Sequence, residues 1–233
     1  MSHFDTTHWS VILEGRRGPE QGRAALAEIC TTYRRPVFAY LRGRGYAPTD
    51  ADDLTQEFFA RFVERRWDQK ADPERGRFRS YLLSALHHFL ANELASQRAH
   101  KRGGDLQRVD LDDVAPSVAE AESPEQVFNR NWMLAVLEHA MRRLEHEACA
   151  QGKEAVFRRL ADYLVEPPDA ADYSQVAAEL GMRVNTVAVC VHRLRQRLRE
   201  LVREELARTV GDPADIEAEL HALREIAGGH VLS

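Results

Sequence analysis

The segment from Arg77 to Arg102 carries side chains that could bind a nucleobase and its phosphates. Tyr81, His88 and Asn92 are seven and four residues apart, so they would share one face of a helix. An aromatic ring, an imidazole and an amide in a row can stack on an unpaired base and bond its edge. Cations suited to phosphates bracket this row: Arg77, Arg79, Arg98, Lys101 and Arg102. The residues alone fit equally a helix whose Tyr81 and His88 cover the core with polar tips in solvent.

A second group of residues that could bind nucleic acid lies between Tyr173 and Leu198. Apolar side chains before Gly181, and again every three or four residues after it, predict two helices joined by a sharp turn. The exposed side of the second helix carries Val189 and the DNA-binding candidates Arg183, Asn185, His192, Arg193, Gln196 and Arg199. A basic face alone would also fit an amphipathic bundle helix. The glycine turn and the spacing favour a helix-turn-helix that enters a major groove.

The segment from Asp50 to Arg66 predicts an amphipathic helix with a broad apolar stripe. Its apolar members are Leu54, Phe58, Phe59, Phe62 and Val63. Asp52, Asp53, Gln56 and Glu57 remain on the polar side. This side could meet a basic partner.

Metal and enzyme chemistry find little support in the sequence. His87 and His88 are adjacent and therefore point about 100° apart on a helix, unlike the i,i+4 pairs of metal sites. The cysteines are Cys30, Cys149 and Cys190, which are far apart and form no CxxC motif, as in a protein of a reducing compartment. No nucleophile–base pair or phosphate-binding glycine loop stands out. We expect no metal, no cofactor and no enzymatic activity.

The spacing of apolar residues predicts helices almost throughout. In the first half we expect helices at 7–15, from Pro19 with an interruption near Pro36, from a cap at Thr49 or Asp50 to 66, and at 77–99. A polar loop should cover 68–76. In the second half we expect helices at 126–148 and 153–164, and others from Ser174, Val184 and Asp212.

A linker is predicted between the two halves. Residues 109–129 contain six acids, two prolines and neither Lys nor Arg. We therefore predict an all-α fold of two helical domains joined by an acidic linker. The expected parts are an extension at 1–19, a domain at 20–105, the linker at 106–125, a helix-turn-helix domain at 126–208 and a helical extension at 209–233.

The composition is that of a soluble globular protein. Hydrophobic residues make up 44% and charged residues 30% of 233 residues, and the net charge is −5. This charge argues against a uniformly basic nucleic-acid coat, although clustered cations remain compatible with DNA binding. No apolar run approaches the ~20 residues of a membrane span, and the first residues do not form a signal peptide. We expect a cytoplasmic protein without membrane insertion.

Two motifs give the chain a family resemblance. Residues 50–57 read DADDLTQE, and residues 173–187 read YSQVAAELGMRVNTV. In this order, with an acidic linker between them, they resemble the sigma-70 family of RNA polymerase sigma factors, in the extracytoplasmic-function class. The resemblance covers roughly residues 20–105 and 126–207. It implies a non-enzymatic initiation factor with region 2 before the linker and region 4 after it.

The resemblance implies partners as well as roles. Asp53, Gln56, Glu57 and Phe58 match positions that dock on the β′ clamp helices of core RNA polymerase. The Tyr81, His88 and Asn92 face matches positions that open and read the −10 element of promoter DNA. The helix-turn-helix matches the part that reads the −35 element as duplex. Further implied partners are the polymerase β flap and, as a regulator, an anti-sigma factor or a Ser/Thr kinase.

The chain also departs from the family pattern. Val189 and Cys190 stand where many relatives carry Arg or Ser, so base readout would either fall on Asn185, His192 and Arg193 or be weak. Tyr81 replaces a usual Trp. Two alternatives remain: a helix-turn-helix regulator that works without core polymerase and senses a ligand in its first half, and an adaptor that binds no DNA.

Overall fold

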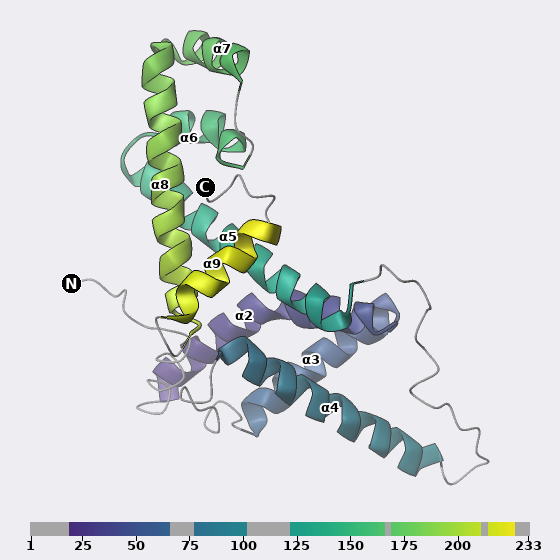
Figure 1. The fold of residues 1–233 in the computed structure, drawn as a ribbon. Coiled ribbons are helices and arrows are strands. Elements are labelled where there is room, and N and C mark those ends of the chain that lie inside the picture. The colour runs from purple at the N-terminus through teal and green to yellow at the C-terminus, as the bar shows by residue number, and fades with distance from the viewer. Residues whose placement is uncertain (1–18, 66–76, 102–121, 166–168, 211–213, 227–233) are drawn as a thin grey trace. The chain divides into compact units, whose positions relative to one another are not determined.

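A computed structural model describes residues 19–65, 77–101, 122–165, 169–210 and 214–226. Their regular structure is helical, which confirms the predicted all-α class (Figure 1). The helices are α2 (Pro19–Gly43), α3 (Pro48–Glu64), α4 (Phe78–Lys101), α5 (Pro124–Ala150), α6 (Glu154–Leu160), α7 (Ala170–Leu180), α8 (Val184–Ala207) and α9 (Asp215–Ile226), with a 3-10 turn, η3 (Asp162–Leu164). The predicted helix at 7–15, the loop at 68–76 and most of the linker lie outside the described residues. No described helix has the length and apolar composition needed to cross a bilayer.

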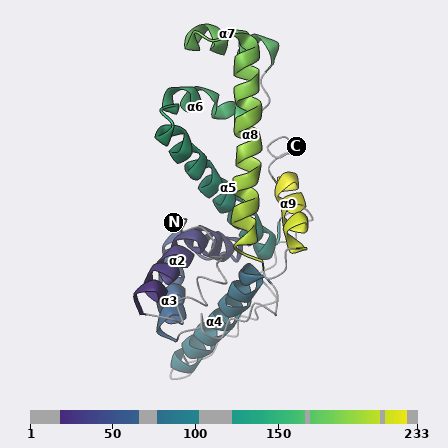
Figure 2. The same ribbon diagram turned by 90° about the vertical axis from the view of Figure 1, so that its left-hand side faces the viewer.

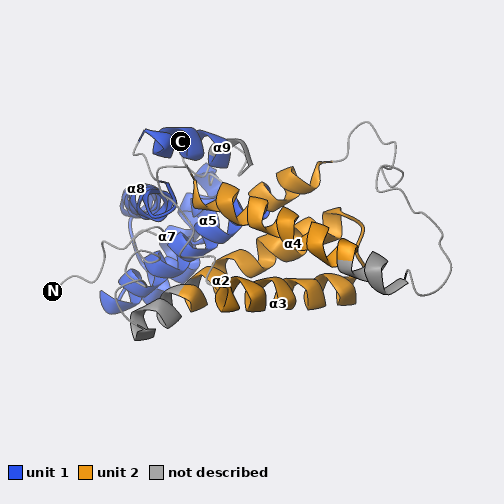
Figure 3. Cartoon of the chain, turned by 90° about the horizontal axis from the view of Figure 1, so that it is seen from below, with its two compact units in different colours: residues 1–11, 130–233 blue, residues 12–129 orange. Residues whose placement is uncertain are grey.

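The chain divides into two compact units (Figure 3). Unit 2 comprises residues 12–129 and holds α2, α3 and α4. Unit 1 comprises residues 1–11 and 130–233 and holds α6 to α9. The division falls within α5, which begins at Pro124, close to the expected start at Gln126.

Aromatic side chains fill the core of unit 2. The ring of Tyr33 in α2 meets Phe78 of α4 edge-on, with centroids 5.4 Å apart. Phe58 of α3 meets Phe89 of α4 in the same way at 5.6 Å. Such edge-to-face pairs add to the hydrophobic stabilisation of the buried rings. Other fully buried core residues here include Ile29, Val37, Leu41, Phe62, Leu82 and Leu86.

The interruption expected near Pro36 is wrong, because α2 continues through this residue to Gly43. A proline inside a helix removes one hydrogen bond and costs about 3 kcal/mol. Tyr33 and Val37 are fully buried on either side of Pro36, so packing of the continuous apolar face outweighs that cost.

The start of α3 also differs from the expected cap at Thr49 or Asp50. Ala47 is the N-cap residue in an extended conformation, and Pro48 occupies the first turn. Proline suits this position because its missing N–H would have no intrahelical partner. Asp50 therefore lies inside the first turn, where its negative charge interacts favourably with the positive end of the helix dipole.

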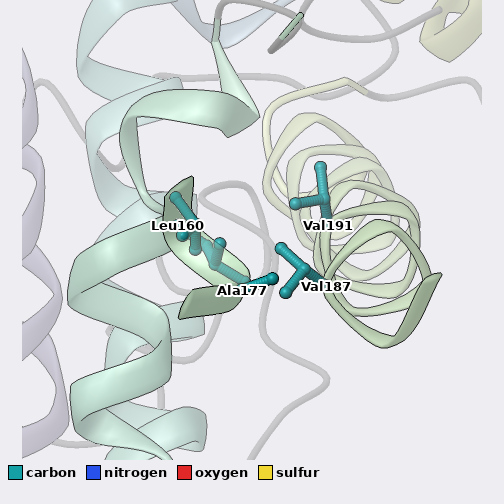
Figure 4. Packing of buried hydrophobic residues seen from close by; sticks show 5 residues of the cluster. Leu160, Ala177, Val187 and Val191 are labelled. Atoms are coloured by element: carbon teal, nitrogen blue, oxygen red, sulfur yellow. The ribbon is translucent and has the colours of Figure 1, made fainter. Parts of the chain in front are cut away.

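In unit 1, α7 packs beside the N-terminal part of α8, and α9 packs beside its C-terminal part (Figures 1 and 2). Leu160, Val176, Ala177, Val187 and Val191 form a buried cluster that joins α6, α7 and α8 (Figure 4). Val187 and Val191 belong to the apolar face predicted for the second helix of the helix-turn-helix, and this face is buried.

Helix α7 begins at Ala170, four residues before the expected start at Ser174. Asp169 and Asp172 form a capping box: the Asp172 N–H donates to Asp169 Oδ1 over 2.8 Å, and the Asp169 N–H donates to Asp172 Oδ2 over 2.9 Å. These bonds satisfy N–H groups that the first turn leaves without helical partners.

Candidate partner and nucleic-acid interfaces

The polar face of α3 is the first candidate surface. Asp53 and Gln56 are exposed, and Glu57 is half-buried. Gln56 donates to Asp52 Oδ2 over 2.8 Å, and Arg61 pairs with Glu57 at 2.5 Å. These i,i+4 contacts fix the side chains on the helix surface. Asp53, Gln56 and Glu57 therefore lie where a partner could reach them.

Phe58 does not share this exposed face. Its side chain is fully buried, and its ring lies 5.1 Å from Phe59, 6.1 Å from Phe62 and 5.6 Å from Phe89. Successive helix residues point about 100° apart, so the residue after Glu57 turns into the core. The expectation that Phe58 belongs to a docking surface is therefore wrong. Phe58 instead packs α3 against the aromatic core. Val63, predicted in the apolar stripe, is 40% exposed.

The second candidate surface lies on α4. His88 and Asn92 are exposed, whereas Tyr81 is half-buried, with its ring 6.2 Å from that of Phe78. The structure thus combines a core-packed tyrosine with two solvent-facing polar groups. Arg77 and Arg79 are partly buried at the start of the helix. The side chains of Arg98 and Lys101, and the whole of Arg102, lie outside the described residues.

The adjacent histidines of α4 have different surroundings. The His87 ring lies 5.5 Å from that of Tyr40, and its Nε2 is 3.6 Å from Glu125 Oε1. His88 is exposed on the surface described above. The pair therefore serves two faces of the helix, as the 100° step between neighbours requires.

The third candidate surface is the helix-turn-helix of α7 and α8. Gly181 ends α7 with a φ of 62°, and the Met182 N–H donates to the carbonyl of Ala177 over 2.8 Å. This Schellman-type turn needs a residue that tolerates the left-handed region. The predicted role of Gly181 is confirmed.

Most of the predicted DNA-binding residues are exposed on the outer side of α8. Arg183, Asn185, His192, Arg193 and Gln196 are exposed, and Arg199 is half-buried. Val187, Val191 and Leu198 are buried on the opposite side. The helix therefore presents polar groups outward and packs through its rear, as a groove-reading helix must.

Several arginines of α8 form hydrogen bonds or ion pairs within unit 1. Arg195 donates through Nε and Nη2 to the carbonyl of Tyr163, over 3.0 and 2.6 Å. Arg197 bonds both oxygens of Glu147 on α5 at 2.8 and 2.9 Å, and its hydrogen bonds lower the pKa of that carboxyl. Arg203 pairs with Glu217 of α9 at 2.5 Å. Because of these contacts, α8 offers less positive charge to a ligand than its number of arginines suggests.

A contact between α6 and α7 positions the first helix of the motif. Arg159 pairs with Glu179, which also accepts from Gln175 over 2.9 Å. The pKa of Glu179 is lowered, chiefly by its bond from Arg159. Neither residue is singled out by local sequence patterns, because their partnership depends on how the helices pack.

A pocket of about 250 Å³ lies among α5, α6 and α8 of unit 1. Leu144, Phe157 and Leu194 contribute apolar side chains to its wall, and Cys190 and Arg193 also line it. Its volume is smaller than the 300–1,000 Å³ typical of small-molecule sites.

Sequence comparison bears on the first two surfaces. The family described as "Sigma-70 region 2" matches residues 29–100, from within α2 almost to the end of α4. This part of the chain is similar to region 2 of sigma-70 factors. The match includes the DADDLTQE motif and the Tyr81, His88 and Asn92 face. The match also supports the prediction that the chain is not an enzyme.

A curated relative extends the likeness beyond region 2. The chain is 29% identical over 160 residues to a protein named "ECF RNA polymerase sigma factor SigE" from Mycolicibacterium smegmatis. The alignment covers 69% of this chain and 54% of that protein, so the chain spans about half the length of this relative. No solved structure matches the chain.

Proposed function

We propose that this chain is a sigma factor that binds core RNA polymerase and directs promoter-specific initiation of transcription. The region 2 match over residues 29–100 carries the proposal, because it falls on the helices that present the first two candidate surfaces. The exposed helix-turn-helix in unit 1 supplies the second DNA-binding element that such a factor uses.

The polar face of α3 is the proposed contact for the β′ clamp helices. Asp53, Gln56 and Glu57 offer acidic and amide groups from one side of a rigid helix. Phe58 and Phe62 anchor that helix to the aromatic core. A basic partner would gain hydrogen bonds to ionised groups there, and these are stronger than neutral ones.

The α4 surface is the proposed site for opening and reading the −10 element. Tyr81 offers part of an aromatic ring, and His88 and Asn92 offer hydrogen-bonding groups to an unstacked base. Arg77 and Arg79, with Arg98, Lys101 and Arg102 from the far end of the helix, are the proposed phosphate contacts.

The outer side of α8 is the proposed reader of the −35 duplex. Arg183, Asn185, His192, Arg193, Gln196 and Arg199 are the proposed contacts. A net charge of −5 and the internal pairing of Arg197 and Arg203 favour weak binding of the free protein to DNA. Promoter recognition would therefore depend on the polymerase.

The remaining partners follow from the same proposal. The polymerase β flap would contact the helix-turn-helix unit, and an anti-sigma factor or a Ser/Thr kinase would regulate the protein. Core RNA polymerase works in the cytoplasm, so we place the chain there.

Co-purification with core bacterial RNA polymerase tests this function. Asp53→Lys reverses an exposed charge on α3, and a Gln56→Ala/Glu57→Lys variant alters its neighbours. Glu145→Lys, which reverses an exposed charge on α5, is the matched control. We expect the wild type and the control to bind core enzyme and to transcribe from a promoter library with a shared −35/−10 pair. The α3 variants should lose both properties.

The alternatives predict other outcomes. A conventional regulator would leave core polymerase unbound and would shift duplex DNA by itself. The aromatic packing in the core of unit 2 favours the sigma factor over a regulator with a ligand pocket there. An adaptor would bind a partner through α3 and would be unaffected by changes in α8.

A further inference from the structure

Val189 occupies an unusual place on α8. It is 48% exposed and is the most exposed of the large hydrophobic residues in the described part of the chain. Asn185 lies one helical turn before it, His192 and Arg193 lie one turn after it, and Gln196 lies two turns after it. All four are exposed. Val189 is thus an apolar spot within a frame of hydrogen-bonding side chains.

Folding does not account for a valine at this position. The rear of α8 already packs through Val187, Val191 and Leu198, all of which are buried. Valine is a weaker helix former than alanine or most long polar residues, because its branched side chain loses rotamer freedom. A single exposed apolar residue is ordinary by itself. Its central place on the face that would enter the groove suggests a ligand with an apolar group.

The major groove offers one such group. Among the base edges exposed there, only thymine presents a methyl group, and apolar side chains contact it. The other edges present donors and acceptors that suit Asn185, His192 and Arg193. A valine among these residues therefore complements a thymine among hydrogen-bonding base edges.

We propose that Val189 reads the 5-methyl group of a thymine in the −35 duplex. The inference rests on the proposed function and adds a specificity-determining residue to its third surface. Side chains four residues apart on a helix are about 6 Å apart, and base pairs rise by about 3.4 Å. The thymine should therefore lie within about two base pairs of the base that Asn185 contacts.

Replacing thymine with uracil tests this contact, because deoxyuridine keeps the pairing edges and lacks only the methyl group. Holoenzyme would be assembled from the full chain and core bacterial polymerase, and its −35 element would be selected from a library. Each −35 thymine would then be replaced singly, and affinity would be measured by competition. Removing one buried methyl group should weaken wild-type binding about fourfold at one position.

Val189→Ala is the decisive variant. It should bind the thymine promoter about fourfold more weakly and should no longer distinguish thymine from uracil at that position. Val165→Ala removes an equally apolar side chain that is 43% exposed and lies outside α8, and it should keep the wild-type response. An unchanged urea midpoint for Val189→Ala would show that the variant is folded.

Two results would overturn the inference. One is a wild-type holoenzyme that selects a −35 element but is insensitive to uracil at every thymine. The other is a Val189→Ala variant that keeps the full sensitivity, in which case another residue reads the methyl group. A wild-type protein that selects no −35 element contradicts the proposed function itself and is recognised before any uracil is introduced.

Discussion

Arg143 of α5 and Glu205 of α8 form an ion pair of 2.6 Å in which the carboxylate is only 3% exposed. His139 Nδ1 and Arg208 Nη1 approach the other oxygen of Glu205 at 3.3 and 3.1 Å. Burial by itself would raise the pKa of Glu205, but the bonds from His139 and Arg143 and the charge of Arg208 lower it to about 2. This network holds the C-terminal half of α8 on α5.

Glu205→Gln should therefore destabilise unit 1. The substitution leaves Arg143, His139 and Arg208 without their shared anion, and removing one partner of a buried pair commonly costs 3–5 kcal/mol. Because these partners are partly exposed, we expect a loss of about 2–3 kcal/mol. Urea unfolding followed by Trp132 fluorescence, in a Trp9→Phe/Trp67→Phe background, would measure it.

Glu200→Gln is the matched control, since Glu200 pairs with Arg197 but is 52% exposed. Exposed pairs contribute about 0–1 kcal/mol, so this variant should unfold close to the wild-type midpoint. Equal losses in the two variants would mean that the buried network has no special role.

The same network predicts how stability changes in acid. The folded-state pKa of Glu205, about 2, lies below the value of about 4.3 for an unfolded glutamate. Its contribution is therefore fully present above about pH 5 and is lost as pH falls from 5 towards 2. The difference in urea midpoint between wild type and Glu205→Gln should shrink across this window. A difference that stays constant, or grows in acid, would contradict the assignment.

The sequence predicts the helices of this protein better than it predicts which of its charged side chains pair. The periodicity of apolar residues predicted α3, α4 and the buried face of α8, because residues three and four apart share one side of a helix. The general rule that proline interrupts a helix failed at Pro36, where long-range packing keeps α2 continuous. The periodicity placed Phe58 in the apolar stripe of α3, where it is fully buried. The family resemblance instead placed it on a docking surface, although Phe58 lies one residue beyond the exposed face.

The candidate DNA surface shows a second limit. The sequence alone does not distinguish the arginines of α8 from one another. In the structure, Arg195 bonds the carbonyl of Tyr163 and Arg197 bonds the carboxylate of Glu147. These partners lie 32 and 50 residues away in the sequence. Only the packing of η3 and α5 against α8 distinguishes the paired arginines from exposed Arg183 and Arg193.

Gly181→Ala should destabilise the helix-turn-helix through its backbone alone. Gly181 has a φ of 62°, and a Cβ added there would meet nothing within 4 Å. The left-handed conformation costs an L-residue roughly 1–2 kcal/mol, and Gly181→Asn should cost less because Asn tolerates this region. Urea midpoints would measure both. Gly152, with a φ of 68° and equal space, is the control, and Gly152→Ala should cost about as much. A far larger loss at Gly181 would reveal a steric role.

Arg193→Ala and Arg197→Ala should separate DNA binding from stability within one helix. Arg193 is exposed on the outer side of α8, so its removal should weaken holoenzyme binding to the −35 element by about 1–3 kcal/mol, with an unchanged urea midpoint. Arg197 bonds Glu147, Glu200 and Glu204. Its removal should lower stability by about 1 kcal/mol and affect DNA only indirectly.

The salt dependence and base preference of the Arg193→Ala variant would then define the contact. Loss of a phosphate contact should weaken binding to all sequences alike and reduce the slope of log affinity against log salt by about one. Loss of a base contact should relax the preference at one position of the −35 element. If Arg197→Ala reduced DNA binding more than Arg193→Ala at an unchanged urea midpoint, the face with Arg197 would read DNA, and the assignment of the outer side would be wrong.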